Sequence, residues 1–90
     1  MDDLRVFSVA DIEAVQFASQ AQLADLEQWA GGQCDMAHDF VFTTPNGEEH
    51  RARPAGPGFQ GDWVCRRTDR PGFEGFFVLT HGAARSLLGV

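Results

Sequence analysis

The sequence predicts an α+β domain, in which a small, mostly antiparallel β-sheet packs with one main α-helix near residues 20–30 and a short C-terminal helix. Three observations favour this class: short segments alternate in polarity, Gly- and Pro-containing turns separate them, and two segments carry helix-capping signals. The chain has 90 residues, which is the size of one domain, so we expect residues 1–90 to fold as a single unit.

The first segment, residues 5–17, opens with an apolar and β-branched run. In a strand, Glu13, Val15 and Phe17 would share one face, and the residues between them would share the other. A helix over the second half of the segment competes with this interpretation, because Asp11 could cap it and the Glu-Ala pair favours helix. Periodicity alone leaves both structures open.

Residues 20–30 carry the clearest helix signals. Ser19 is a favourable N-cap residue, and Gln22 three positions later completes a capping-box pattern. Gly31 ends the helix, because glycine adopts the left-handed cap conformation at low cost. The apolar stripe that would face the core consists of Leu23, Leu26 and Ala30, with Trp29 beside it.

The remaining segments predict a hairpin, two further strands and the final helix. Residues 39–44 alternate as a strand, a Pro-Asn-Gly turn follows, and residues 49–53 return as its antiparallel partner. Beyond a Gly/Pro-rich loop, strands are expected over 61–67 and 73–80. Thr80 can cap a helix over 81–88. The residues that this helix would bury are Ala84, Leu87 and Leu88.

Two segments together resemble a known group of proteins. The first is residues 12–17 (IEAVQF), followed by a helix that ends at residues 29–32 (WAGG). The second is residues 61–66 (GDWVCR), followed by a turn, residues 76–78 (FFV) and a terminal helix. The pair is similar to small accessory proteins of tailed bacteriophages and prophages. Those proteins run from an EAVQW-like start through a helix and a GDW(I/V)VRG element to GEF and a C-terminal P-x-x-F-x-x-x-Y.

The resemblance covers about half of the chain, at its two ends. It implies a phage origin, a location in the host cytoplasm, an α+β fold and a strand at residues 12–17. It implies no particular activity, because the family has no established one. The chain departs from the pattern where Ala84 and Leu88 replace the terminal aromatic pair, where the turn after Arg66 is longer, and in the middle hairpin.

The net charge of −6 argues against a nucleic-acid binder, which normally carries a basic face. Residues 1–49 hold ten acids and one arginine, whereas residues 50–90 hold three acids and six arginines. Either the two halves interleave in the fold and average the charge, or the asymmetry marks a polar interface. No apolar run approaches the roughly 20 residues that span a bilayer, and the first residues lack a signal-peptide pattern, so we expect a cytoplasmic protein without membrane contact.

Catalytic and metal-binding motifs are weak. Cys65 is the candidate nucleophile, because the neighbouring Arg66 could lower its pKa, but a mid-strand position is a poor place for substrate to approach. Zinc-competent side chains occur without a paired Cys-x2-Cys or His-x3-His element, so we expect no metal and no cofactor. These side chains are Cys34, His38, His50, Cys65 and His81.

A tryptophan close to several arginines predicts the binding site, because Trp and Arg dominate binding hot spots. Aromatic residues in Gly/Pro-rich loops are also less easily explained as core. Trp63 has a competing interpretation as an ordinary core or edge aromatic. The predicted interface consists of Trp63, Arg66, Arg67, Arg70, Phe59 and Phe73.

These features predict a non-enzymatic, phage-encoded accessory protein that modulates its host by binding a host protein. Self-association as a symmetric dimer is a further expectation, because small sheets leave edges that pair. One alternative is a small enzyme that uses Cys65 with a histidine. Another is an acidic nucleic-acid mimic that inhibits a host nucleic-acid-binding or defence protein. The mimic requires a single acidic face made of Asp11, Glu13, Asp25, Glu27, Asp35 and Asp39.

Overall fold

The computed structural model describes residues 4–31, 39–70 and 72–90, which form two antiparallel sheets and two α-helices. A four-stranded sheet has the order β1-β2-β5-β6, and a separate hairpin pairs β3 with β4. The strands are β1 (Val6–Val9), β2 (Ile12–Gln16), β3 (Phe40–Thr43), β4 (Glu49–Ala52), β5 (Trp63–Arg67) and β6 (Phe76–Leu79). The helices are α1 (Leu23–Ala30) and α2 (His81–Leu88), with short 3-10 turns at η1 (Gln20–Gln22) and η2 (Gly72–Gly75).

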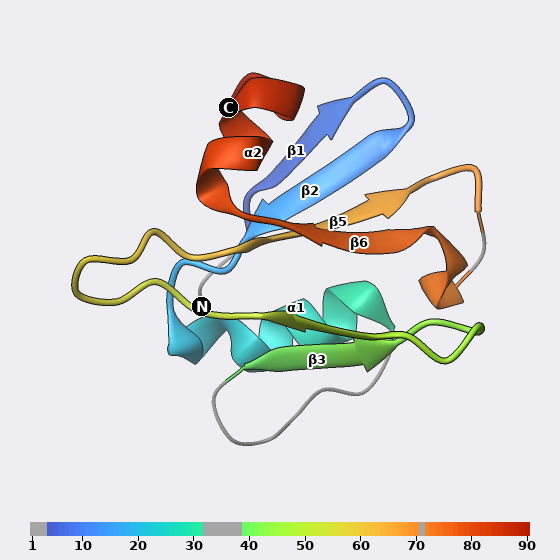
Figure 1. The fold of residues 1–90 in the computed structure, drawn as a ribbon, viewed down its shortest axis with the longest axis horizontal. Helices are drawn as coiled ribbons and strands as arrows, with labels where there is room; N and C mark the ends of the chain where they lie inside the picture. Colours follow the sequence, from blue (N-terminus) through green and yellow to red (C-terminus); the bar gives the residue numbers. More distant parts are fainter. Residues whose placement is uncertain (1–3, 32–38, 71) are drawn as a thin grey trace.

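The elements stack in three layers (Figure 1). Helix α2 covers one face of the four-stranded sheet, while α1 and the β3–β4 hairpin lie on the other face. The predicted α+β class, with one main helix and a short C-terminal helix, is confirmed. The strands are divided between two sheets, because the hairpin packs its aromatic face against the main sheet instead of extending it.

Residues 12–16 form β2, so the strand interpretation of this segment is confirmed and the helix is excluded. β2 is a central strand, paired with β1 on one side and β5 on the other. Val15 and the following Phe17 are buried toward α1, and Ala14 is buried toward α2. Burial on both faces favours an extended strand, whose side chains alternate between faces, over a helix with one buried stripe.

The β1–β2 hairpin turns through only two residues, Ala10 and Asp11. Ala10 has a φ of +53°, a left-handed conformation that is costly for alanine. The carbonyl oxygen of Asp11 accepts a hydrogen bond from the Thr68 N–H at 2.8 Å. The tip of this hairpin is therefore tied to the turn between β5 and β6.

Helix α1 begins with a reciprocal cap, although not at the atoms that the sequence indicates. Ser19 Oγ accepts from the Ala21 N–H (3.1 Å), and Gln22 Oε1 accepts from the Ala18 N–H (3.0 Å). Each donor lies one residue earlier than in a capping box, because the first turn is a 3-10 turn. Gly31 ends the helix in the left-handed conformation, as predicted.

The predicted bounds of the C-terminal helix match α2, and the Thr80 hydroxyl caps its first turn. Ala84 and Leu88 are buried, but Leu87 is 68% exposed, so the expectation that Leu87 packs in the core was wrong. Residues four apart share one helix face, and Leu87 lies off that face. The strand expected over 73–80 begins only at Phe76, because η2 occupies the preceding residues.

Two hydrophobic clusters lie on opposite faces of the main sheet. The cluster on the α1 side consists of Val15, Phe17, Leu26, Phe40, Phe42, Ala52, Val64 and Phe76. The cluster on the α2 side consists of Ala14, Trp63, Cys65, Ala84 and Leu88. Val64 enters the first cluster while Trp63 and Cys65 enter the second, so β5 is covered on both faces over these residues.

Candidate functional site

Strand β1 carries three of the four large apolar side chains that are exposed in the described chain; the fourth is Leu87 of α2. Val6 is 42% exposed, Phe7 40% and Val9 39%. β1 pairs with β2 along one edge, and no other strand in the described ranges pairs with its outer edge. We call this outer row of backbone groups, with the side chains of Val6–Val9, the β1 edge. It contains neither the charges nor the proline that commonly protect such edges from pairing.

The short turn determines which backbone groups of β1 point outward. Val9 and Ile12 flank a two-residue turn, so they form a hydrogen-bonded pair. Hydrogen-bonded and non-hydrogen-bonded pairs alternate along an antiparallel ladder. Phe7, two residues before Val9, therefore also directs its N–H and C=O toward β2. The N–H and C=O groups of Val6 and Ser8 therefore point away from the sheet, where an added strand could pair with them.

A pocket of about 290 Å³ opens beside the start of the β1 edge. Phe7 and Trp63 form its aromatic wall, with ring centroids 5.3 Å apart in an edge-to-face arrangement. The indole Nε1–H of Trp63 donates to His81 Nδ1 at 3.1 Å, which fixes the orientation of both rings. Arg5 and Gln16 supply polar groups to the lining. The pocket thus offers apolar surface and hydrogen-bonding groups next to an open strand.

The structure separates the residues of the predicted Trp/Arg interface. Trp63 is only 3% exposed and belongs to the cluster beneath α2, so the core interpretation describes it. Arg66 points to the other face of β5, where its guanidinium pairs with Glu13 (2.8 Å) and lies over the Trp29 ring, 4.1 Å from its centroid. An odd spacing along a strand places two side chains on opposite faces, so residues 63 and 66 cannot share one surface.

The other predicted interface residues occupy three further places. Arg67 and Arg70 lie near the β5–β6 turn, and each pairs with a nearby carboxylate. Phe73 packs against the cluster on the α1 side. Phe59 lies in the loop before β5, beneath the Arg53 guanidinium, whose Cζ is 4.3 Å from the ring centroid. The six residues do not form one continuous surface.

The segments that carry the phage resemblance pair with each other as β2 and β5. Gly61 has a φ of +41°, and a Cβ at this position would clash with the Phe17 carbonyl oxygen. Asp62 is buried, and its carboxylate accepts from the Arg53 N–H at 2.9 Å. Each residue of the Gly-Asp-Trp element therefore shapes the fold, and of the three only Trp63 borders a pocket, the one beside β1.

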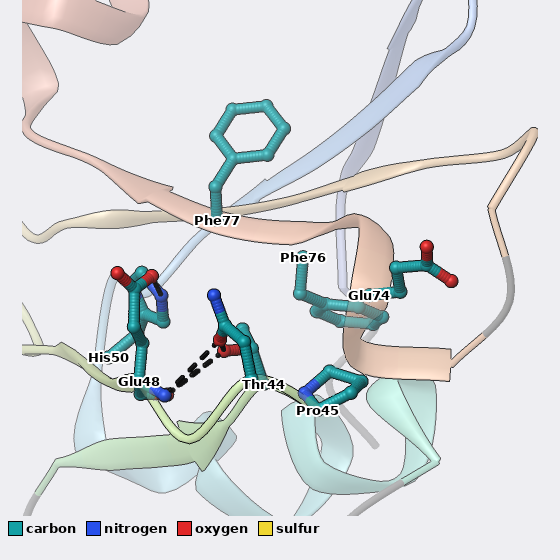
Figure 2. Close-up of a pocket in the computed structure, with 8 residues that line it drawn as sticks. Thr44, Pro45, Glu48, His50, Glu74, Phe76 and Phe77 are labelled. Carbon is teal, nitrogen blue, oxygen red and sulfur yellow. Dashed lines mark hydrogen bonds and ion pairs between the residues drawn. The ribbon is translucent and has the colours of Figure 1, made fainter.

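A larger pocket of about 600 Å³ lies between the β3–β4 turn and β6 (Figure 2). Phe76 points from β6 toward the hairpin, and Glu48 Oε1 lies 3.7 Å from His50 Nε2 at the start of β4. The Thr44 hydroxyl bonds to groups within the turn, namely the Asn46 side chain and the Glu48 backbone. The Thr44, Asn46 and Glu48 groups of the lining therefore hold the turn together, and the Thr44 hydroxyl is bonded within the turn and not to a base.

Cys65 is a buried packing residue beneath α2. Burial raises the pKa of its thiol to about 12, so the thiol stays protonated near neutral pH. This geometry does not support the cysteine-enzyme alternative. Within the described ranges, no three His, Cys, Asp or Glu side chains are placed to hold a metal ion. Cys34 and His38 lie outside the described residues.

Ion pairs join the acidic first half of the chain to the arginine-rich second half. Glu13 pairs with Arg66 at 2.8 Å, and Asp39 pairs with Arg51 at 2.9 Å. The interleaved interpretation of the charge asymmetry therefore fits the fold. These two acids belong to the six that the nucleic-acid mimic requires, and a third, Asp35, lies outside the described residues.

Comparison of the chain with family models, with curated proteins and with solved structures gives no match. Both α-helices of the described part of the chain have eight residues, and neither is long and apolar enough to cross a membrane.

Proposed function

We propose that this chain is a phage-encoded accessory protein that binds a partner protein by adding a β-strand to the β1 edge, without catalysing a reaction. The β1 edge carries the proposal: three apolar side chains, 39–42% exposed, lie on a strand with no strand partner on its outer side in the described chain. The phage origin rests on the resemblance of the β2 and β5 segments, and it would place the protein in the cytoplasm of a bacterial host.

An added strand would pair with the outward backbone groups of β1 and would also cover its exposed apolar side chains. Backbone hydrogen bonds to Val6 and Ser8 would provide affinity that does not depend on the partner's side chains. Phe7 and Val9 lie on the α2 face of the sheet and Val6 on the opposite face. An incoming strand with apolar residues would therefore be covered on both faces, and the pocket beside Phe7 can hold one larger side chain.

The two alternatives receive less support from the geometry. A nucleic-acid mimic needs acids that are free to replace phosphates, whereas Glu13 and Asp39 are already paired with arginines. A cysteine enzyme needs an accessible thiolate, whereas Cys65 is buried and protonated. Binding at the β1 edge requires neither the release of a paired acid nor the exposure of a buried thiol, because the apolar side chains of β1 already face solvent.

The test uses a photo-crosslinking amino acid at Val9, on the β1 edge, and at Leu87 as an exposed position on α2. We expect a defined adduct from Val9 in bacterial cells and no matching adduct from Leu87. Adding Ser8→Pro should abolish the Val9 adduct, because proline removes an outward N–H and leaves the pairing of Phe7 and Val9 with β2 intact. An adduct that survives Ser8→Pro, or no adduct from a folded protein, would show that the β1 edge is not the binding surface.

A further inference from the structure

We infer that the pocket of about 290 Å³ beside β1 is a binding site for a small carboxylic acid that carries one aromatic ring. This inference goes beyond the proposed function, because it concerns a free small molecule and not the partner protein at the β1 edge. It is argued from the cation at one end of the pocket and from the fixed aromatic wall. The volume lies at the low end of the roughly 300–1,000 Å³ of ligand pockets, which suits one ring with a short chain.

The sheet register brings the lining residues into one row. Gln16 lies opposite Trp63 of β5, and continuing the β1–β2 register by one residue sets Arg5 opposite Gln16. Phe7 lies on the same face of β1 as Arg5, because alternate residues of a strand share a face. His81 lines the same pocket from the first turn of α2. The pocket therefore has a guanidinium at its β1 end and an indole at its β5 end.

Arg5 gives the pocket its charge. It is exposed, and it forms no ion pair with any residue of the described chain, Val90 of the lining included. No aspartate or glutamate lines the pocket, although the protein has a net charge of −6. A guanidinium can donate two parallel hydrogen bonds to one carboxylate. Charge complementarity therefore favours a carboxylate ligand at this end.

The apolar part of the ligand meets rings whose orientation is already fixed. The rings of Trp63 and His81 are nearly parallel, at 19°, with centroids 6.3 Å apart, and Phe7 meets the indole edge to face. An indole N–H can only donate, so His81 Nδ1 accepts its hydrogen bond. The side-chain nitrogen of Gln16 lies 3.3 Å from the same Nδ1. This wall is held in place before a ligand binds, which favours a planar ring against it.

The two halves of the ligand follow the row across the sheet. Arg5 and Trp63 lie two strands apart, which corresponds to roughly 10 Å between their backbones. The Arg5 side chain reaches along part of this distance. A carboxylate that a short chain separates from its ring can therefore meet the guanidinium and the aromatic wall together.

The experiment titrates 3-phenylpropanoate into the full chain and follows the indole N–H signals by NMR. The Trp63 signal should shift, and the Trp29 signal, on the α1 side, should not. We expect a Kd of about 1 mM for a probe of this size. Arg5→Gln should weaken binding about fivefold. Arg85→Gln removes the same charge from an exposed position of α2 outside the pocket, so it should change the Kd little.

The uncharged amide of the probe, 3-phenylpropanamide, separates the contribution of the charge from that of the ring. It should bind about fivefold more weakly than the acid, and Arg5→Gln should leave its affinity unchanged. Three results would each overturn the inference: equal binding of acid and amide, acid binding that Arg5→Gln leaves unchanged, or a Trp63 signal that does not move in the folded protein.

The last residue of a polypeptide carries the same ligand chemistry, so the peptide acetyl-Ala-Ala-Phe with a free carboxylate is measured beside the acid. Affinity no higher than that of the acid supports a free small molecule. Binding tighter by about tenfold would contradict it and assign the pocket to the end of a polypeptide chain. None of these titrations contains a partner protein, so their outcome is independent of the crosslink from Val9.

Discussion

Glu13 and Arg66 lie directly opposite each other on β2 and β5, and their side chains form a 2.8 Å ion pair on the α1 face of the sheet. The same guanidinium donates to the Trp29 carbonyl oxygen at 2.8 Å and lies over the Trp29 ring. One arginine therefore joins two central strands to the end of α1. It also explains how a chain with an acidic first half folds against its arginine-rich second half.

Arg66→Ala is expected to lower the free energy of unfolding by about 2 kcal/mol, because it removes an ion pair, a hydrogen bond and a ring contact together. The next residue offers a matched control. Among the residues that the structure describes, Arg67 forms an ion pair only with the exposed Asp69, so Arg67→Ala should leave stability nearly unchanged. Urea unfolding of both variants measures the difference, and equal losses would contradict the bridging role of Arg66.

Gly61→Ala is expected to destabilise the fold by about 3 kcal/mol or more, because the added Cβ meets the Phe17 carbonyl oxygen in a left-handed backbone. Gly58 also has a positive φ, but a Cβ there would meet nothing within 4 Å. Gly58→Ala should therefore cost only about 1–2 kcal/mol. Chemical denaturation of the two variants separates the clash from the backbone strain, and similar losses would argue against the clash.

Ala10→Gly is expected to raise the free energy of unfolding by about 0.5–1 kcal/mol. Alanine is strained at a φ of +53°, and glycine relieves this strain at a smaller cost in the entropy of the unfolded chain. The midpoint of urea unfolding should move to higher denaturant with an unchanged slope. A lower midpoint would show that the turn between β1 and β2 is not strained.

Stability is expected to fall as the pH rises from about 9 toward about 12, because of Cys65. The thiol ionises near its ordinary pKa of 9.0 in the unfolded chain, but burial holds it protonated to about 12 in the folded state. Above pH 9 the folded state binds the extra proton, so raising the pH favours unfolding. Urea unfolding at several pH values, in a Cys34→Ser background, measures how the free energy of unfolding falls with pH. Adding Cys65→Ala should remove most of this pH dependence. If the pH dependence stays unchanged, it arises from groups other than Cys65.

Local signals predicted much of this fold. The bounds of α2 follow from Thr80 and the apolar spacing behind it, and the end of α1 follows from Gly31. The alternation of Phe40 and Phe42 correctly indicated a strand with one buried face. The separation into two sheets could not be predicted, because it depends on which distant surface the aromatic face of the hairpin covers.

The candidate site was harder to predict, because composition does not show which strand lies at an edge. The cluster of Trp63 with Arg66 looked like a hot spot, yet strand alternation sends them to opposite faces. A usable signal lay in β1 itself. Val6, Phe7 and Val9 place apolar side chains on both faces, which a strand with one neighbour cannot fully bury.

Amide hydrogen exchange of the individual β1 residues, followed by NMR in dilute protein, tests most directly whether β1 offers an open edge. Phe7 and Val9 donate to β2 and should be protected from exchange. Val6 and Ser8 should exchange fast, because their N–H groups point away from the sheet and no strand in the described chain pairs with that side of β1. Slow exchange of Val6 and Ser8 would contradict an open β1 edge.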